Sequence, residues 1–279
     1  MSLTAMNTEG IALHTVLCKP KFHSMSPLVL QLSNHAVQKF AQEHGSTAIH
    51  FKLQSSRLDA KTMQYLNSHR WPVLTSVDLM GQVDDDAMLH VANGSWGHCE
   101  SLCVQSGLTE KGVCYLRAGS LSNMQDLSLL ELDTAGIKAV ASGSWPHLTR
   151  LSLSYATPDR LGFESLSCAP WKHLNSIVLL CVQIDAAAAA HLILADWPLL
   201  QELVVTHKYV QEAAYEVLGA QSVRYQLDRL EKELMLHQLP VNVHFPRRTD
   251  TAWPQLKHIS VIAGTSFLKA RTKTTCGLN

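Results

Sequence analysis

The fold is decided by the stretch Ser144-Trp145-Pro146-His147-Leu148-Thr149-Arg150-Leu151-Ser152-Leu153. In this stretch an aromatic residue is followed by apolar residues three, six and eight positions later. The same spacing begins again at positions 22, 45, 71, 96, 121, 171, 197 and 253, which we call anchors together with 145. All six tryptophans are anchors, and up to 197 the anchors lie 23 to 26 residues apart. A fixed period of this length predicts a solenoid of stacked repeats.

Each repeat combines the period of a strand with the period of a helix. After the anchor, Leu151 and Leu153 alternate with polar neighbours, as a strand with one buried face requires. Before the anchor, apolar residues such as Ile137 and Val140 are three apart, which places one face of a short helix on the core. We therefore predict an α/β solenoid, with a curved parallel sheet inside and short helices outside.

Two further positions of the helical half recur. An apolar residue thirteen positions before the anchor is expected to fill the turn from strand to helix. Nine positions before the anchor the side chain is small, which lets the helix backbone approach its neighbour. These small residues are Ala36, Ala87, Gly112, Gly136, Gly162 and Ala188, with Thr62 as the exception.

This pattern resembles the leucine-rich repeat proteins, in particular the ribonuclease-inhibitor-like and GALA-type repeats. The resemblance is strongest in residues 108–116 and 132–140, and it covers about residues 22–206 and the strand after Trp253. It implies a non-catalytic scaffold for protein–protein interaction. The family usually places an Asn after the strand, whose side chain bonds backbone groups between repeats. Here that position carries no Asn, so we expect the turns to satisfy their backbone in another way.

The period fails after Thr206. We predict leucine-rich repeats over 1–206, a helical insertion or cap over 207–252, the last repeat strand over 253–262 and a disordered tail over 263–279. Within the insertion, Val210 to about Gln238 is rich in helix-forming residues and predicts one long helix. Residues 241–245 predict an irregular strand. The chain is either capped by that helix or a segment of a longer product.

Composition narrows the function further. The formal net charge is zero, so no global field attracts nucleic acid or an anionic membrane. No run of 18 apolar residues and no secretory signal is seen, so we expect a cytoplasmic protein without a membrane partner. The seven cysteines are odd in number and scattered, which favours a reducing compartment over a disulfide framework.

The sequence predicts no catalytic, cofactor-binding or metal-binding residue. His98 with Cys99, Cys103 and Cys114 allows a zinc hypothesis, but Cys99 occupies an apolar core position of the frame, where a small buried thiol is the commoner explanation. The acidic run 84–86 begins a predicted helix. Capping of exposed N–H groups explains that run better than calcium, because spaced oxygen ligands are absent.

The candidate partner-binding residues are the outward side chains of the strands, which would line the concave face. They are Asp78, Asp126, Ser128, Arg150, Ser152, Ser154, Val178, Leu180, Glu202 and Val204. We expect them to lie at the surface and to contribute little to the core. The apolar group Val178, Leu180 and Val204 marks either an external partner's site or the seat of the 207–252 segment.

Two functional hypotheses remain open. The first is a scaffold that binds another protein through the concave face, a surface that repeat stacks provide. Relatives in the repeat class include ubiquitin-ligase substrate adaptors, which would need a further N-terminal domain. The second is activation of a GTPase, which in the repeat class acts through an arginine. Arg150 is the arginine on the predicted inner face.

Overall fold

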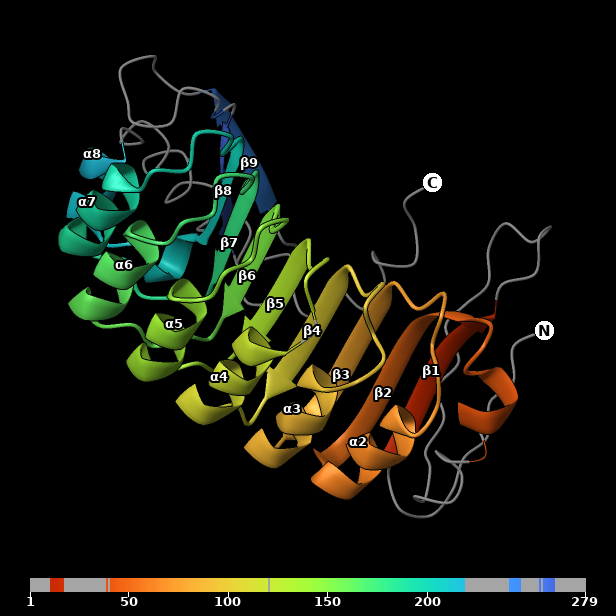
Figure 1. The fold of residues 1–279 in the computed structure, drawn as a ribbon. Coiled ribbons are helices and arrows are strands. Elements are labelled where there is room, and N and C mark those ends of the chain that lie inside the picture. Colours follow the sequence, from red (N-terminus) through yellow and green to blue (C-terminus); the bar gives the residue numbers. More distant parts are fainter. Residues whose placement is uncertain are drawn as a thin grey trace, which may run out of the picture. The chain divides into compact units, whose positions relative to one another are not determined.

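The computed structural model describes residues 11–17, 39, 41–119, 121–218, 241–246, 256 and 258–263. These residues form two compact units. The first comprises the residues up to Glu131 together with Gly143–His147, and the second comprises Leu132–Ser142 and the residues from Leu148 onwards. In both units parallel strands alternate with short helices (Figure 1), which confirms the predicted α/β repeat solenoid.

The first unit contains five strands in sequence order. Strand β1 (Ile11–Leu17) pairs antiparallel with β2 (Ala48–Leu58), and β2, β3 (Ser76–Val83), β4 (Ser101–Ser106) and β5 (Asp126–Leu130) follow in parallel. Helices α2 (Ala60–Asn67), α3 (Asp85–Ala92) and α4 (Glu110–Ala118) line one face of these strands (Figure 1). Strand β1 was not expected from the sequence.

The second unit contains β6 (Arg150–Ser154), β7 (Ser176–Leu180) and β8 (Glu202–Thr206) in parallel, followed by β10 (His258–Ala263), which is parallel to β8. Strand β9 (Val241–Pro246) pairs antiparallel with β10. Helices α5 (Thr134–Ala141), α6 (Arg160–Ser167), α7 (Ala186–Leu194) and α8 (Glu212–Val217) cover one face (Figure 1). The strands predicted at 241–245 and before 262 are thus present.

The structure tests only part of the long helix predicted from Val210 to Gln238. Helix α8 extends over Glu212–Val217, with Leu218 as its C-cap residue. The rest of the predicted helix lies outside the described residues, as does the tail 264–279.

The core of each unit lies between the strands and the helices. In the first unit Trp71 is 1% exposed, donates its Nε1–H to the Leu66 carbonyl oxygen at 2.8 Å and contacts Phe51. In the second unit Trp171 and Trp197 are almost fully buried, and their rings stack with centroids 6.4 Å apart. These tryptophan anchors are therefore core residues. Burial of large aromatic rings supplies much of the hydrophobic stabilisation of a core.

A recurring cap starts the helices, at the position twelve residues before the anchor. In α5 the Asp133 side chain accepts a hydrogen bond from the Gly136 N–H, three residues later, at 2.8 Å. The same bond forms at Asp59, Asp84, Asp159 and Asp185, and at Thr109 the side chain accepts from Lys111 instead. The cap bonds the N–H of the recurring small residue in four helices, α3, α5, α6 and α7, and that of Thr62 in α2. This periodic Asp is visible in the sequence, at positions 59, 84, 133, 159 and 185.

The capping explanation of the acidic run 84–86 is confirmed. Asp84 accepts from the Ala87 N–H at 2.7 Å, so it caps its own helix. Asp85 reaches the next repeat, where its carboxylate accepts from the N–H groups of Thr109 and Gly112, both at 3.0 Å. Asp86 forms an ion pair with Lys111 at 3.0 Å. The three adjacent carboxylates thus bond to different groups.

Bonds between repeats replace the missing Asn of the family pattern. In the second unit the Thr157 N–H donates to the Leu132 carbonyl, and the Gln211 N–H to that of Ile184, both at 2.8 Å. The Asp159 N–H donates to the Thr134 hydroxyl oxygen at 2.8 Å. The expectation that the turns satisfy their backbone by other means is therefore confirmed.

Candidate partner-binding surface

The candidate surface is the face of each sheet opposite the helices, which we call the helix-free face. In the first unit it carries His50, Lys52, Ser76, Asp78, Met80, Ser101, Cys103, Gln105, Asp126 and Ser128. In the second unit it carries Arg150, Ser152, Ser154, Ser176, Val178, Leu180, Glu202, Val204 and Thr206. All ten sequence-predicted candidates lie on one of these two faces, because side chains alternate across a strand.

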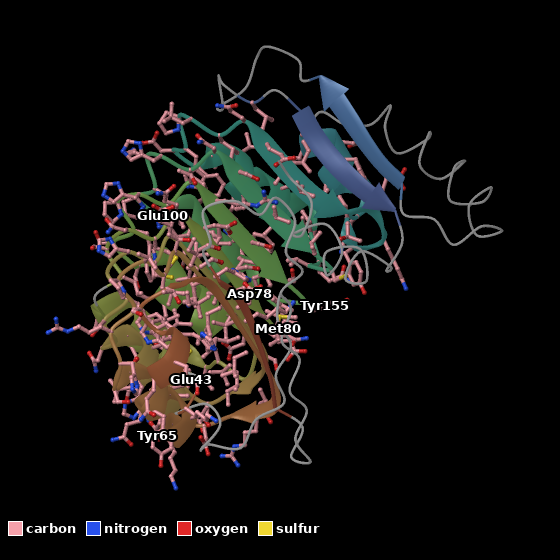
Figure 2. All side chains as sticks on the ribbon, turned by 90° about the vertical axis from the view of Figure 1, so that its right-hand side faces the viewer. Glu43, Tyr65, Asp78, Met80, Glu100 and Tyr155 are labelled. Carbon is pink, nitrogen blue, oxygen red and sulfur yellow. The ribbon has the colours of Figure 1, made fainter. Side chains whose placement is uncertain are left out.

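The first helix-free face is half-buried and mostly polar. Figure 2 shows Asp78 and Met80 on β3, with Tyr65 on the helix side of the same unit. Lys52, Asp78, Cys103 and Ser128 occupy paired positions on four neighbouring strands. All members of the face are intermediate in exposure except Ser128, which is 5% exposed. This face therefore presents a row of accessible polar groups from adjacent strands.

His50 and Asp78 lie side by side on the first face. His50 Nε2 lies 3.7 Å from Asp78 Oδ2, and the two side chains are 28% and 22% exposed. Burial lowers the pKa of His50; the Asp78 carboxylate raises it, and the Lys52 ammonium group lowers it further. Because the balance lies below 6.5, the imidazole is mostly neutral at pH 7.

The second helix-free face is closed. Val178, Leu180 and Val204 are 2%, 4% and 7% exposed and form one apolar cluster. The hydroxyl-bearing members Ser152, Ser154 and Thr206 are at most 3% exposed. The expectation that Ser128, Ser152 and Ser154 lie at the surface is therefore wrong. For Val178, Leu180 and Val204, burial favours an internal seat over an exposed external site, the two alternatives that the sequence left open.

Polar groups at the start of the second face are partly satisfied. Arg150, Ser176 and Glu202 occupy paired positions on β6, β7 and β8. The Ser176 hydroxyl donates to Glu202 Oε2 at 2.9 Å. Arg150 is half-buried, and its Nε has no hydrogen-bond partner in the structure. Asp126 of the first unit is likewise half-buried and has its own interaction partner.

The cysteines of the zinc hypothesis do not converge. Cys99 is 1% exposed, and burial raises the pKa of its thiol to about 12, so it remains protonated at neutral pH. Cys103 lies on the helix-free face instead, half-exposed. Within the described ranges, no group of three His, Cys, Asp or Glu side chains is arranged to hold a metal ion. The core explanation of Cys99 is confirmed.

Comparison with protein-family models and with curated proteins finds no match for this chain. In the part of the chain that the structure describes, none of the helices has the length and apolar character needed to cross a membrane. A proposal for the function therefore rests on the fold and on the two helix-free faces.

Proposed function

We propose that this chain is a leucine-rich-repeat scaffold that binds another protein through the helix-free face of its first unit. The repeat length, the buried apolar frame and the alternation of parallel strands with short helices support membership of that repeat class. A repeat stack presents a row of equivalent strand positions to a partner, so that many modest contacts add up over an extended surface.

One observation carries the proposal, namely the difference in exposure between two equivalent faces. On the first face the outward side chains Asp78, Met80 and Cys103 are partly accessible, and they come from adjacent paired strands. Mixed polar and apolar groups of this kind suit a protein interface, which is about as apolar as other protein surface. On the second face Val178, Leu180 and Val204 are at most 7% exposed and belong to the buried residues of the fold.

The proposal can be tested by site-specific photo-cross-linking with the full chain. A photoreactive amino acid replaces Gln105, on the first helix-free face, or Gln64, an exposed residue of α2. Lysate from cells that produce the protein is irradiated with each variant, and adducts are identified by mass spectrometry. We expect a discrete protein adduct from position 105 and none from position 64. Equal adducts from both positions, or none, would contradict the proposal.

A further inference from the structure

Among the described residues, Asp78 has no cationic side chain within hydrogen-bond distance. Within the described residues its one ion-pair contact is His50, which is mostly neutral at pH 7 because burial lowers the pKa of that imidazole. Lys52 occupies the paired position on β2, but its ammonium group forms no ion pair with Asp78. The Asp78 carboxylate, 22% exposed, is therefore accessible and has no cationic side chain within hydrogen-bond distance among the described residues, so an external cationic donor can pair with it.

The surroundings of Asp78 add an apolar contact. Met80 follows two residues later on the same strand face, about 7 Å away at the rise of a β-strand. A flexible thioether adapts to the partner that it contacts. A carboxylate beside a methionine matches a side chain that has a cationic head on an aliphatic stem. A guanidinium fits best, because its planar donors pair with carboxylates in two-bond geometry.

We propose that Asp78 and Met80 form the docking point for an arginine side chain of the partner protein, with the guanidinium on the carboxylate and the methylene groups against Met80. This inference rests on the proposed function, since it names the chemistry that the first helix-free face would recognise. Charge complementarity favours an arginine at this point. A partner that presents an acidic residue here would instead place a like charge next to Asp78.

The test uses the full chain and two short peptides, acetyl-Leu-Arg-Leu-amide and the same peptide with the uncharged isostere citrulline. Binding is followed by amide chemical shifts during titration at low salt. We expect the arginine peptide to bind about fivefold more tightly than the citrulline peptide, as for a modest ion pair. In Asp78→Asn the two peptides should bind equally. In Met80→Ala both should weaken while their ratio persists.

Glu100→Gln is the matched control, because it removes one carboxylate from the same unit at an exposed position beside β4, apart from Asp78 (Figure 2). It should leave the preference for arginine unchanged. Equal binding of both peptides to the parent chain, the absence of binding, or a preference that survives Asp78→Asn would overturn the inference.

Cross-linking from Gln105 separates this inference from the scaffold proposal. If the adduct persists in full in Asp78→Asn, the scaffold function stands and the arginine docking point is wrong. Loss of the adduct in Asp78→Asn, but not in Glu100→Gln, supports both.

Discussion

The two helix-free faces occupy the same place in the repeat and differ in burial. Asp78 and Val178 both lie seven residues after a tryptophan anchor, and Met80 and Leu180 both lie nine residues after it. In the first unit this pair is half-exposed, whereas Val178 and Leu180 are 2% and 4% exposed. The repeat therefore dictates on which side of the sheet a residue lies, but it does not dictate how far that side is exposed.

The helix-facing sides of the two units do not differ in this way. Trp71 and Trp171 are both 1% exposed at their anchor positions. We predict that Trp71→Ala and Trp171→Ala each lower the free energy of unfolding by about 3–5 kcal/mol, the usual cost of truncating a buried large aromatic. Thermal and urea unfolding of the two variants measure this. Melting temperatures close to the parent's would show that the anchors are not core residues.

The largest difference between the units is expected at Leu180 and Met80. Leu180→Ser removes a buried side chain and buries a hydroxyl, so we predict a loss of about 3 kcal/mol in the free energy of unfolding. Met80→Ser, at the equivalent half-exposed position, should change it by less than about 1 kcal/mol. Urea unfolding of both variants gives the contrast. Equal losses would mean that the two faces are equally closed.

These two predictions show what the sequence could and could not supply. Alternation around Leu151 and Leu153 correctly predicted the strand and its buried face, because that pattern depends on neighbours in the chain. The burial of Leu180 favours the internal seat that the sequence left open beside an external site, because alternation within a strand does not distinguish these two alternatives. The candidate residues were thus placed on the right face, and Ser128, Ser152 and Ser154 were wrongly expected to be exposed.

Helix caps and turn conformations differ in how far the sequence predicts them. The Asp caps recur in the sequence at a fixed distance from the anchor, and a search for helix N-cap residues would have found them. Backbone strain was less visible. Tyr155 and Cys181, which follow β6 and β7, have φ of 56° although neither is a glycine. Such a conformation depends on the tight turn and not on residue preference.

The helix caps should contribute equally in both units. Asp84→Ala in the first unit and Asp185→Ala in the second each remove one carboxylate that accepts a helix N–H at 2.7 Å. We predict that each loses about 1 kcal/mol, the usual value of an N-cap. Urea unfolding measures both. Thr109→Ala should cost less, since Asp85 also bonds the start of that helix. A larger loss for Thr109→Ala than for Asp84→Ala would contradict this account.

The smallest expected effect is the pH dependence that His50 gives to the first unit. The folded-state pKa of His50 lies below its unfolded value of 6.5, so the unfolded chain binds the proton more tightly. The stability from a neutral His50 is therefore fully present above pH 6.5 and is lost as the pH falls from 6.5 through the lowered folded pKa. Carboxylates such as Asp159, whose pKa is lowered chiefly by the hydrogen bond from the Gly162 N–H, act in a separate window below 3.8.

Substitutions of the neighbours separate His50 from the other histidines. The urea midpoint should fall less between pH 7.5 and 5.5 (about one unit on either side of 6.5) in His50→Gln than in the parent. The fall should be steeper in Asp78→Asn, because the carboxylate that raises the pKa of His50 is lost. It should be shallower in Lys52→Gln, because the ammonium group that lowers this pKa is lost. Val178→Asn, at the position equivalent to Asp78, should lower the midpoint at every pH without changing its slope, since Arg150, Ser176 and Glu202, which occupy the equivalent of the His50 position on β6, β7 and β8, are not histidines. If Asp78→Asn and Lys52→Gln move the slope in the same direction, the electrostatic account of the first face is wrong.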